Sequence, residues 1–579
     1  MRTGISNIKY ELLVFVIIFA FAGSFNFLFP GLTMTSGTDE FGTISGAAFA
    51  AGYDWSALVS RIPYYGFGYS VLMTPLFLSG LSPSAIYIGM LFYNTVCLAL
   101  SGVICYRILT KVFESTNTSL NVLIALAAGL FAPNLFESNF VMNESMLVLL
   151  NWIVLYLLLI MYKRTENGEK NIIHSIILSF VLCYGLLVHT RMFFVWGAVA
   201  VFIVLYLIIK KKLIVNLPAF AASLAAFYLI SRALISSVQA ALWGGSDEAA
   251  RNTVESLGWN FSLLTKVLTY DGMTTALKNF TGQLYSVFTF TGGFAYILFA
   301  AFIIGVVCFI IPKTRKRVWA FAQENKALTL AIAYTAVQMA AILLMISAGS
   351  IIHTSGEMGF INTKWFLYTR YWAVCAAPAA MLAIVLFSRL GKSRLVLGLA
   401  GIMTIGVIAL FFLKVAPYLY GVANIWSSIY YQYHGLALMQ GGDKFTVQSL
   451  MIITLIAGAA TVLIWICISR QRYTTAVIVF LVFSLYTYIY PTLGIYTDNS
   501  KYMYAQATGV AAQLESAGIT PEQQPYIYAY GPEVTLANIQ FNLYMFKVIP
   551  VEDSENTERY PLFISVPEDG SEISVYINK

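Results

Sequence analysis

Residues 10–29 read YELLVFVIIFAFAGSFNFLF, an apolar run whose single charge, Glu11, stands at its second position. About 20 apolar residues suffice for a helix to cross a bilayer. Of the 579 residues in the chain, 59% are hydrophobic and only 11% are charged, and the mean hydropathy is +0.75. Because soluble domains carry about 25% charged residues, the composition predicts a polytopic α-helical membrane protein.

The same length and apolarity recur along the chain, and they predict about thirteen spanning helices. The predicted spans are residues 10–29, 85–108, 119–136, 145–162, 172–190, 193–209, 213–235, 293–311, 326–348, 371–388, 395–413, 447–469 and 473–492. An odd number of spans puts the two termini on opposite sides of the membrane.

Positive charges indicate which loops lie on the inner side. Basic clusters at 210–212 and 313–317 follow the sixth and eighth predicted spans, where the chain is on the same side as its N-terminus. The acids predicted to lie on that side are Glu11, Glu114, Glu166, Glu169 and Glu324. The positive-inside rule therefore predicts a cytoplasmic N-terminus and an extracytoplasmic C-terminus.

The remaining bulk features exclude some classes of function. The net charge of +7 is spread over many short loops, so it indicates no nucleic-acid partner. The six cysteines lie in apolar runs without CxxC spacing, which predicts neither a disulfide framework nor a cysteine metal site. Low cysteine content and the lack of an organelle signal favour the plasma membrane of a bacterium.

The predicted division places a transmembrane domain at 1–492, with long outer loops at 30–84, 236–292 and 414–446. Glycines and prolines interrupt the first loop, so we expect short helices lying in the membrane interface there. A rival interpretation makes 67–80 a span, but it would invert every later loop and place the lysine clusters outside.

The C-terminal segment, 493–579, has the composition of a small extracytoplasmic α/β domain. Its pattern predicts helices at 499–517 and 533–542 and strands at 526–530, 545–550, 562–566 and 573–577. The segment contains neither a glycine-rich phosphate loop nor a histidine, so we assign it no catalysis.

Candidate acids lie on the outer side of the membrane. The pair Asp39-Glu40 stands ten residues beyond the first predicted span, and Glu144 stands at the outer entrance to the fourth. Such acids also occur as solvated loop charges or at helix N-termini. Polar groups are costly at a membrane surface, and this favours a functional site.

Candidate bases lie on the same side. Arg191 follows the fifth predicted span, and Lys364 and Arg370 precede the tenth. Snorkelling explains each basic residue alone. Because they depart from the preference for basic inner loops and flank one surface, the acids and bases together predict a site for an anionic lipid headgroup beside a carboxylate.

Roughly the first 200 residues resemble the GT-C superfamily, membrane glycosyltransferases that use polyprenyl-phosphate sugars, such as protein O-mannosyltransferases and the lipid A aminoarabinose transferase. The resemblance rests on Asp39-Glu40, on AAFAAGYDW at 47–55, on YYGFGY at 64–69, on VMNES at 141–145 and on Thr190-Arg191. The chain departs from the usual pattern at Tyr64-Tyr65, which lack prolines, and at Asn143-Glu144, where relatives often have Asp.

The resemblance implies roles for individual residues. Asp39 corresponds to the catalytic base, with Glu40 as a helper, and we expect Arg191, Lys364 and Arg370 to contact the lipid phosphate. Glu144 corresponds to a metal ligand or a positioning group, so a divalent metal ion stays open as a cofactor. A single base without a general acid predicts inversion at the anomeric carbon, by analogy with inverting glycosidases.

The implied function is transfer of a sugar from a polyprenyl-phosphate donor, with membrane lipid around the protein and a cell-envelope glycan, lipid or protein as acceptor. The first alternative is a transporter or flippase of a lipid-linked saccharide, and the second is a non-catalytic membrane scaffold or a polysaccharide polymerase-like enzyme. Transporters tend to show internal repeats and acids near mid-membrane, whereas nearly all the acids here stand at span edges or in loops.

Overall fold

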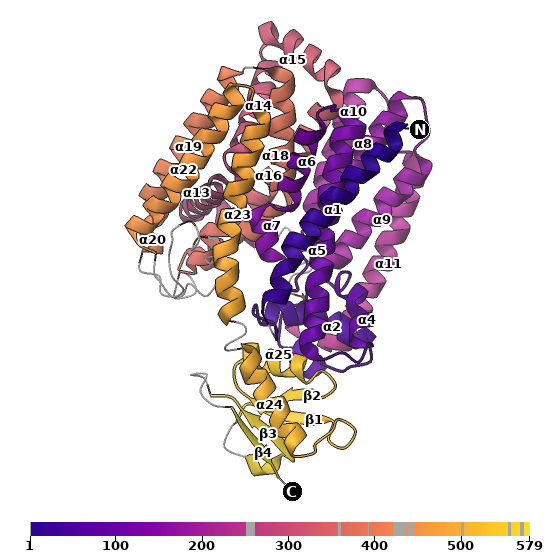
Figure 1. Cartoon of the computed structure of the whole chain (residues 1–579), viewed down its shortest axis with the longest axis vertical. Coiled ribbons are helices and arrows are strands. Elements are labelled where there is room, and N and C mark those ends of the chain that lie inside the picture. The colour runs from indigo at the N-terminus through magenta and orange to yellow at the C-terminus, as the bar shows by residue number, and fades with distance from the viewer. Residues whose placement is uncertain are drawn as a thin grey trace.

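The computed structural model describes residues 2–29, 31–250, 261–356, 361–391, 393–420, 433, 436, 445–498, 503–553, 557–567 and 573–578. A bundle of long helices forms most of the molecule, and a small domain containing a β-sheet lies at one end of the bundle (Figure 1). The N-terminus lies at the far end of the bundle and the C-terminus at the tip of the small domain. The predicted fold class is confirmed.

Ten helices within the described residues are long and apolar enough to cross a membrane. They are α1 (Arg2–Leu28), α5 (Pro83–Arg107, continued by the π-helical turn η2, Ile108–Val112), α8 (Glu144–Glu166), α10 (Met192–Lys210), α11 (Leu217–Trp243), α16 (Lys326–Gly349), α18 (Thr369–Leu390, preceded by η4, Thr363–Leu367), α19 (Arg394–Lys414), α22 (Val447–Ser469) and α23 (Tyr473–Asp498). Each contains or closely matches one of the predicted spans.

Two of the predicted spans are shorter helices. The run at 119–136 is divided into α6 (Thr118–Gly129) and α7 (Ala132–Glu137). Pro133 starts α7, where its missing N–H costs nothing, whereas it would break a continuous helix. The run at 172–190 forms α9 (Ile172–Val188), which has 17 residues.

A third predicted span, 293–311, belongs to a bent pair. Helices α13 (Tyr270–Thr291) and α14 (Phe294–Ile310) meet at an angle of 118°. Gly292 and Gly293 join them with φ angles of 55° and 77°, which glycine adopts without a steric penalty. Counting the pair as one span, the described residues contain up to eleven.

Short helices occupy the loops at both ends of the bundle. The first long loop contains α2 (Thr38–Ala50), α3 (Ser56–Val59), η1 (Ser70–Met73) and α4 (Thr74–Phe77), and the other short helices are η3 (Asp247–Ala250), α12 (Phe261–Leu268), α15 (Pro312–Glu324), α17 (Ile351–Thr354) and α20 (Ala416–Leu419). Residues 67–80 therefore form no spanning helix. Most of the predicted loop at 414–446 lies outside the described residues.

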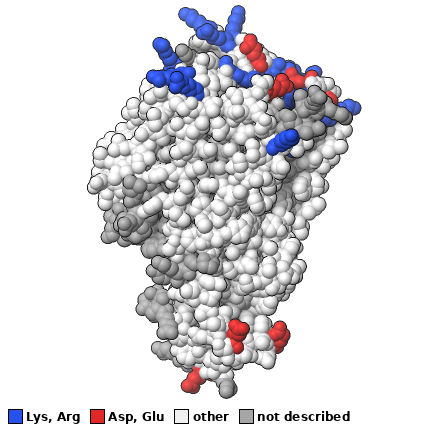
Figure 2. All heavy atoms as spheres, viewed as in Figure 1, with Lys and Arg blue, Asp and Glu red and all other residues white. Residues whose placement is uncertain are grey.

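Charge is distributed unevenly along the molecule. In Figure 2, lysines and arginines gather at the end that carries α15, and the acids visible at the opposite end lie on the small domain. Between the two ends, the visible surface of the described residues is almost free of charge. This band is the surface that a bilayer would cover.

The C-terminal domain contains α24 (Tyr504–Ser516), β1 (Tyr526–Tyr530), α25 (Glu533–Asn542), β2 (Lys547–Pro550), η6 (Thr557–Arg559), β3 (Leu562–Ser565) and β4 (Ser574–Ile577). The strand order is β2-β1-β3-β4, with β1 parallel to β2 and β3, and β4 antiparallel to β3. The predicted strands are thus all present. Helix α23 contains Pro491 and extends beyond the predicted end of its span at 492 to Asp498.

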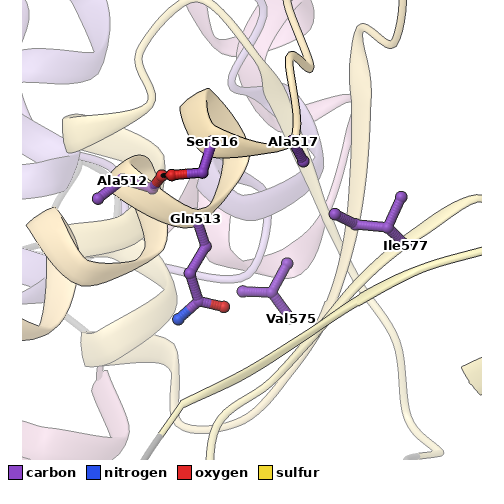
Figure 3. Close-up of a pocket in the computed structure, with 6 residues that line it drawn as sticks. All are labelled: Ala512, Gln513, Ser516, Ala517, Val575 and Ile577. Atoms are coloured by element: carbon purple, nitrogen blue, oxygen red, sulfur yellow. Dashed lines mark hydrogen bonds between the residues drawn. The ribbon is translucent and has the colours of Figure 1, made fainter.

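A shallow hollow of about 480 Å³ lies between α24 and β4. It is lined by Ala512, Gln513, Ser516, Ala517, Val575 and Ile577 (Figure 3).

Candidate functional site

Asp39 is the second residue of α2, at the end of the bundle that carries the C-terminal domain. Gly37 precedes the helix with a φ of 54°, a conformation that favours glycine. The side chain of Asp39 is 33% exposed, and its place in the first turn puts a negative charge at the positive end of the helix dipole.

Two groups hold the Asp39 carboxylate. The Tyr65 hydroxyl donates a hydrogen bond to Oδ1, and Nη1 of Arg370 donates to Oδ2 at 2.7 Å. Burial, followed by the charge of Asp39, raises the pKa of Tyr65 well above its ordinary value, so this hydroxyl stays protonated and remains a donor.

Next to Asp39, and joined to it through Arg370, lies a cluster of buried charges. Glu144, at the start of α8, accepts hydrogen bonds on Oε1 from Nε of Arg370 at 2.5 Å and from Nη2 of Arg191. Arg370 belongs to the first turn of α18, and Arg191 precedes α10. The side chains of Glu144, Arg191 and Arg370 are 4%, 5% and 9% exposed. Arg370 therefore bridges the two carboxylates of the site.

Arg191 also rests on an aromatic column. Its guanidinium lies 4.4 Å from the ring centre of Tyr371. The column continues through Tyr368 at 4.8 Å, Trp365 at 4.7 Å and His353 at 5.0 Å between successive ring centres. Stacking of this kind fixes the plane of a guanidinium, so Arg191 presents its donors in a set direction.

Lys364 does not join the cluster. It is half-buried in η4, and it makes no ion pair with any residue that the structure describes. The structure thus brings together Asp39, Glu144, Arg191 and Arg370, which come from four separate regions of the chain, and leaves Lys364 apart.

Glu40 points away from its neighbour Asp39 and is fully buried. Its four hydrogen bonds come from the backbone N–H groups of Thr35 (2.8 Å), Ser36 (2.7 Å) and Val141 (2.7 Å) and from the Tyr87 hydroxyl (2.6 Å). Because both carboxylate oxygens are fully engaged, this arrangement favours a structural role over the helper role implied by the resemblance.

Three residues near the site carried no assignment in the sequence. Tyr65 belongs to the YYGFGY motif, and its neighbourhood to Asp39 depends on the fold. Glu137 is buried and interacts electrostatically with Arg370, Glu144 and Arg191. In the sequence, only its spacing of seven residues from Glu144 indicated that it could lie near the site. His189 accepts a hydrogen bond from the backbone N–H of Arg191 at 3.2 Å on Nδ1.

His189 does not add a positive charge to the site. Burial, followed by the charge of Arg191, lowers the pKa of the His189 imidazole well below its usual value. A neutral ring also fits the observed hydrogen bond, because Nδ1 must be unprotonated to accept it.

The carboxylates do not form a metal site in the described part of the chain, where no group of three His, Cys, Asp or Glu side chains is placed to hold an ion. Oε2 of Glu144 has no hydrogen-bond partner among the described residues, but two guanidinium groups already neutralise this carboxylate. The residues present fit a guanidinium-based anion site better than a cation site.

The geometry defines what the site can do chemically. Asp39 is a partly exposed carboxylate whose oxygens each retain a free lone pair, so it can accept a proton from a bound hydroxyl. Arg370 uses Nε and Nη1 for the carboxylates, and a guanidinium has five N–H donors. Donors therefore remain for an anionic ligand beside the carboxylate.

Replacing Tyr65 with Phe is expected to lower the turnover of a reaction that uses Asp39 by about 10- to 100-fold, because a hydrogen bond to a charged group contributes about 1.5–3 kcal/mol. Tyr64→Phe is the matched control, since the Tyr64 hydroxyl is buried and has no hydrogen-bond partner among the residues that the structure describes. Steady-state kinetics of the two variants check this, and equal turnover in both would show that Tyr65 does not orient the base.

No known protein-family profile matches the chain, and no curated protein sequence matches it. Solved structures do resemble it. The crystal structure of ArnT from Cupriavidus metallidurans bound to undecaprenyl phosphate is 14% identical, with a TM-score of 0.48 over 95% of this chain and 86% of that one. The archaeal oligosaccharyltransferase AglB from Archaeoglobus fulgidus, in complex with an inhibitory peptide and a dolichol-phosphate, is 12% identical, with a TM-score of 0.44 over 93% of this chain and 64% of that one.

At 12–14% identity, the similarity concerns the overall arrangement of the chain alone.

Proposed function

We propose that this chain is an integral membrane glycosyltransferase that transfers a sugar from a polyprenyl-phosphate donor to an acceptor hydroxyl on the outer face of the membrane. The observation that carries the proposal is a partly exposed carboxylate, Asp39, paired with one of two buried arginines, Arg370 and Arg191, which share the carboxylate of Glu144. A hydroxyl acceptor requires the first, and a lipid-phosphate leaving group requires the second.

In the proposed reaction, Asp39 takes the proton of the acceptor hydroxyl while the oxygen attacks the anomeric carbon of the donor. A new bond forms between that carbon and the acceptor oxygen, and the bond to the phosphate oxygen breaks. The lipid phosphate leaves with the bonding electron pair. Direct displacement by this route inverts the anomeric configuration.

The arginines make a general acid unnecessary. Negative charge grows on the departing phosphate, and preorganised guanidinium donors stabilise such charge in a site shielded from water. Arg370 is held by both carboxylates, and Arg191 is held by Glu144 and the Tyr371 ring. Glu144 thus serves as the positioning group for the arginines in this mechanism.

The proposed orientation places the site outside the cell. The basic end of the molecule carries α15 and the N-terminus, while α2 and the C-terminal domain lie at the opposite end (Figures 1 and 2). The positive-inside rule assigns the basic end to the cytoplasm. Polyprenyl-phosphate sugar would then reach Asp39 from the outer leaflet of a bacterial plasma membrane, and the acceptor would be a glycan, lipid or protein of the cell envelope.

The decisive experiment incubates the purified protein with a panel of radiolabelled polyprenyl-phosphate sugars and a membrane extract that supplies the acceptor. We expect release of polyprenyl phosphate from at least one donor, with the label appearing in a macromolecular or lipid product. Binding of a lipid-linked saccharide without any release, by folded protein, would contradict the proposal and favour the transporter. The broken pair α13–α14 is a feature found in transporters.

A further inference from the structure

The C-terminal domain is joined to the loop that carries Asp39 by a set of buried polar contacts. Helix α25 of that domain packs against α2 (Figure 1). From these contacts we infer that the C-terminal domain aims the candidate base, and that Asn538 of α25 is the residue that positions it. The inference rests on the proposed function, because it assigns a catalytic consequence to this contact.

Asn538 uses both ends of its side-chain amide. Its Oδ1 accepts a hydrogen bond from Oγ1 of Thr33 at 3.0 Å, and its Nδ2 donates to the backbone carbonyl of Met34 at 3.1 Å. Asn542, one turn later, donates from Nδ2 to Oγ1 of Thr33 at 2.9 Å. Thr33 and Asn538 are 0% and 2% exposed, so water cannot replace these bonds.

The segment held by Asn538 in turn holds α2. The backbone N–H groups of Thr35 and Ser36, the next two residues, donate to Oε2 of Glu40. Glu40 is the neighbour of Asp39 in the first turn of α2. Through its other oxygen, Glu40 binds the backbone N–H of Val141, three residues before Glu144. Asn538 is therefore linked through Glu40 to the loops of both carboxylates.

The chain that follows α2 is fixed to the same domain. Nε1 of Trp55 donates to the backbone carbonyl of Tyr544 at 3.0 Å, and the Trp55 ring stacks on Phe41 of α2 at 5.0 Å between ring centres. Nζ of Lys547 pairs with Asp54 at 2.5 Å. Because the domain grips the chain before and after α2, it limits rotation and translation of the helix that carries Asp39.

A general base acts only when its oxygen lies within hydrogen-bond reach of the acceptor hydroxyl. Displacement of a catalytic group by about 1 Å can cost about 10²-fold in rate. Loss of the Asn538 contacts should therefore reduce turnover more than phosphate binding, because the bonds of Arg191 and Arg370 to Glu144 do not involve Asn538. This pattern separates a positioning role from general destabilisation.

The test replaces Asn538 with Leu, which has similar volume and no hydrogen-bonding group. We expect kcat to fall by about 10- to 100-fold, with the dissociation constant for polyprenyl phosphate changed less than about 2-fold and faster amide hydrogen exchange at Thr35 and Ser36. Gln513→Leu is the matched control, because Gln513 lines the hollow between α24 and β4 (Figure 3). It should leave all three measurements unchanged.

An Asn538→Leu protein that keeps wild-type kcat and wild-type exchange at Thr35 and Ser36 would overturn the inference. If the variant does not fold, Asn538→Asp replaces it, because Asp keeps the acceptor for Thr33 and loses the donor to Met34; the same two outcomes then decide. If the wild type transfers no sugar, the proposed function fails, while unchanged exchange in the variant would still refute the contact itself as a restraint on this segment.

Discussion

Asp39→Asn is expected to lower the kcat of sugar transfer by about 10³-fold, within the range that general bases contribute. Asparagine has almost the same shape and can still accept a hydrogen bond from Tyr65 or Arg370, but it cannot take a proton from the acceptor. The arginines remain in place, so binding of polyprenyl phosphate should persist. Release of radiolabelled donor and equilibrium binding of polyprenyl phosphate measure the two effects separately.

The matched control for this change is Asp271→Asn. Asp271 is an exposed acid at the start of α13, so the substitution removes the same charge from another outer segment. We expect this variant to retain wild-type turnover. Near-normal transfer by Asp39→Asn protein would remove Asp39 as the base and leave the site without an accessible carboxylate among the residues described.

Arg370→Met is expected to remove both transfer and detectable binding of polyprenyl phosphate, and to destabilise the fold by about 3–5 kcal/mol. Arg370 neutralises two carboxylates at once, and Glu144 would be left buried with Arg191 as its remaining ion-pair partner. Thermal unfolding in detergent and binding of the lipid phosphate report the two effects.

Two further variants separate charge from chemistry. Arg370→Lys keeps the positive charge between the two carboxylates but lacks the planar fork of a guanidinium, so it should recover much of the lost stability without recovering transfer. Arg389→Met is the control on the same helix, at its other end, where Arg389 binds Asn325 and Phe113. Unimpaired lipid-phosphate binding by the Arg370→Met protein would exclude Arg370 from the donor site.

Part of the site could be found in the sequence because it depends on where charges stand relative to the membrane. Asp39, Glu144, Arg191 and Arg370 each follow or precede an apolar run on the same side, and the cost of such positions singled them out. Lys364 met the same criterion but lies apart from the cluster. It belongs to η4, before α18, and closeness in sequence to Arg370 does not set the direction of its side chain.

The neighbouring acids Asp39 and Glu40 show the same limit. In a helix, successive side chains point about 100° apart, so one carboxylate faces Arg370 and the other is buried among the N–H groups of residues 35, 36 and 141. Which of the two meets Arg370 depends on how α2 packs. Only the tertiary structure decided that.

The apolar runs by themselves determined the membrane class, the position of nearly every spanning helix and the strands of the C-terminal domain, because each depends on local composition and periodicity. Where a run is broken depends on backbone conformations at residues such as Gly292 and Gly293, which composition does not specify. The contact of Asn538 with Thr33 joins residues 505 positions apart. Such pairings follow from packing of whole elements, and only the tertiary structure decided them.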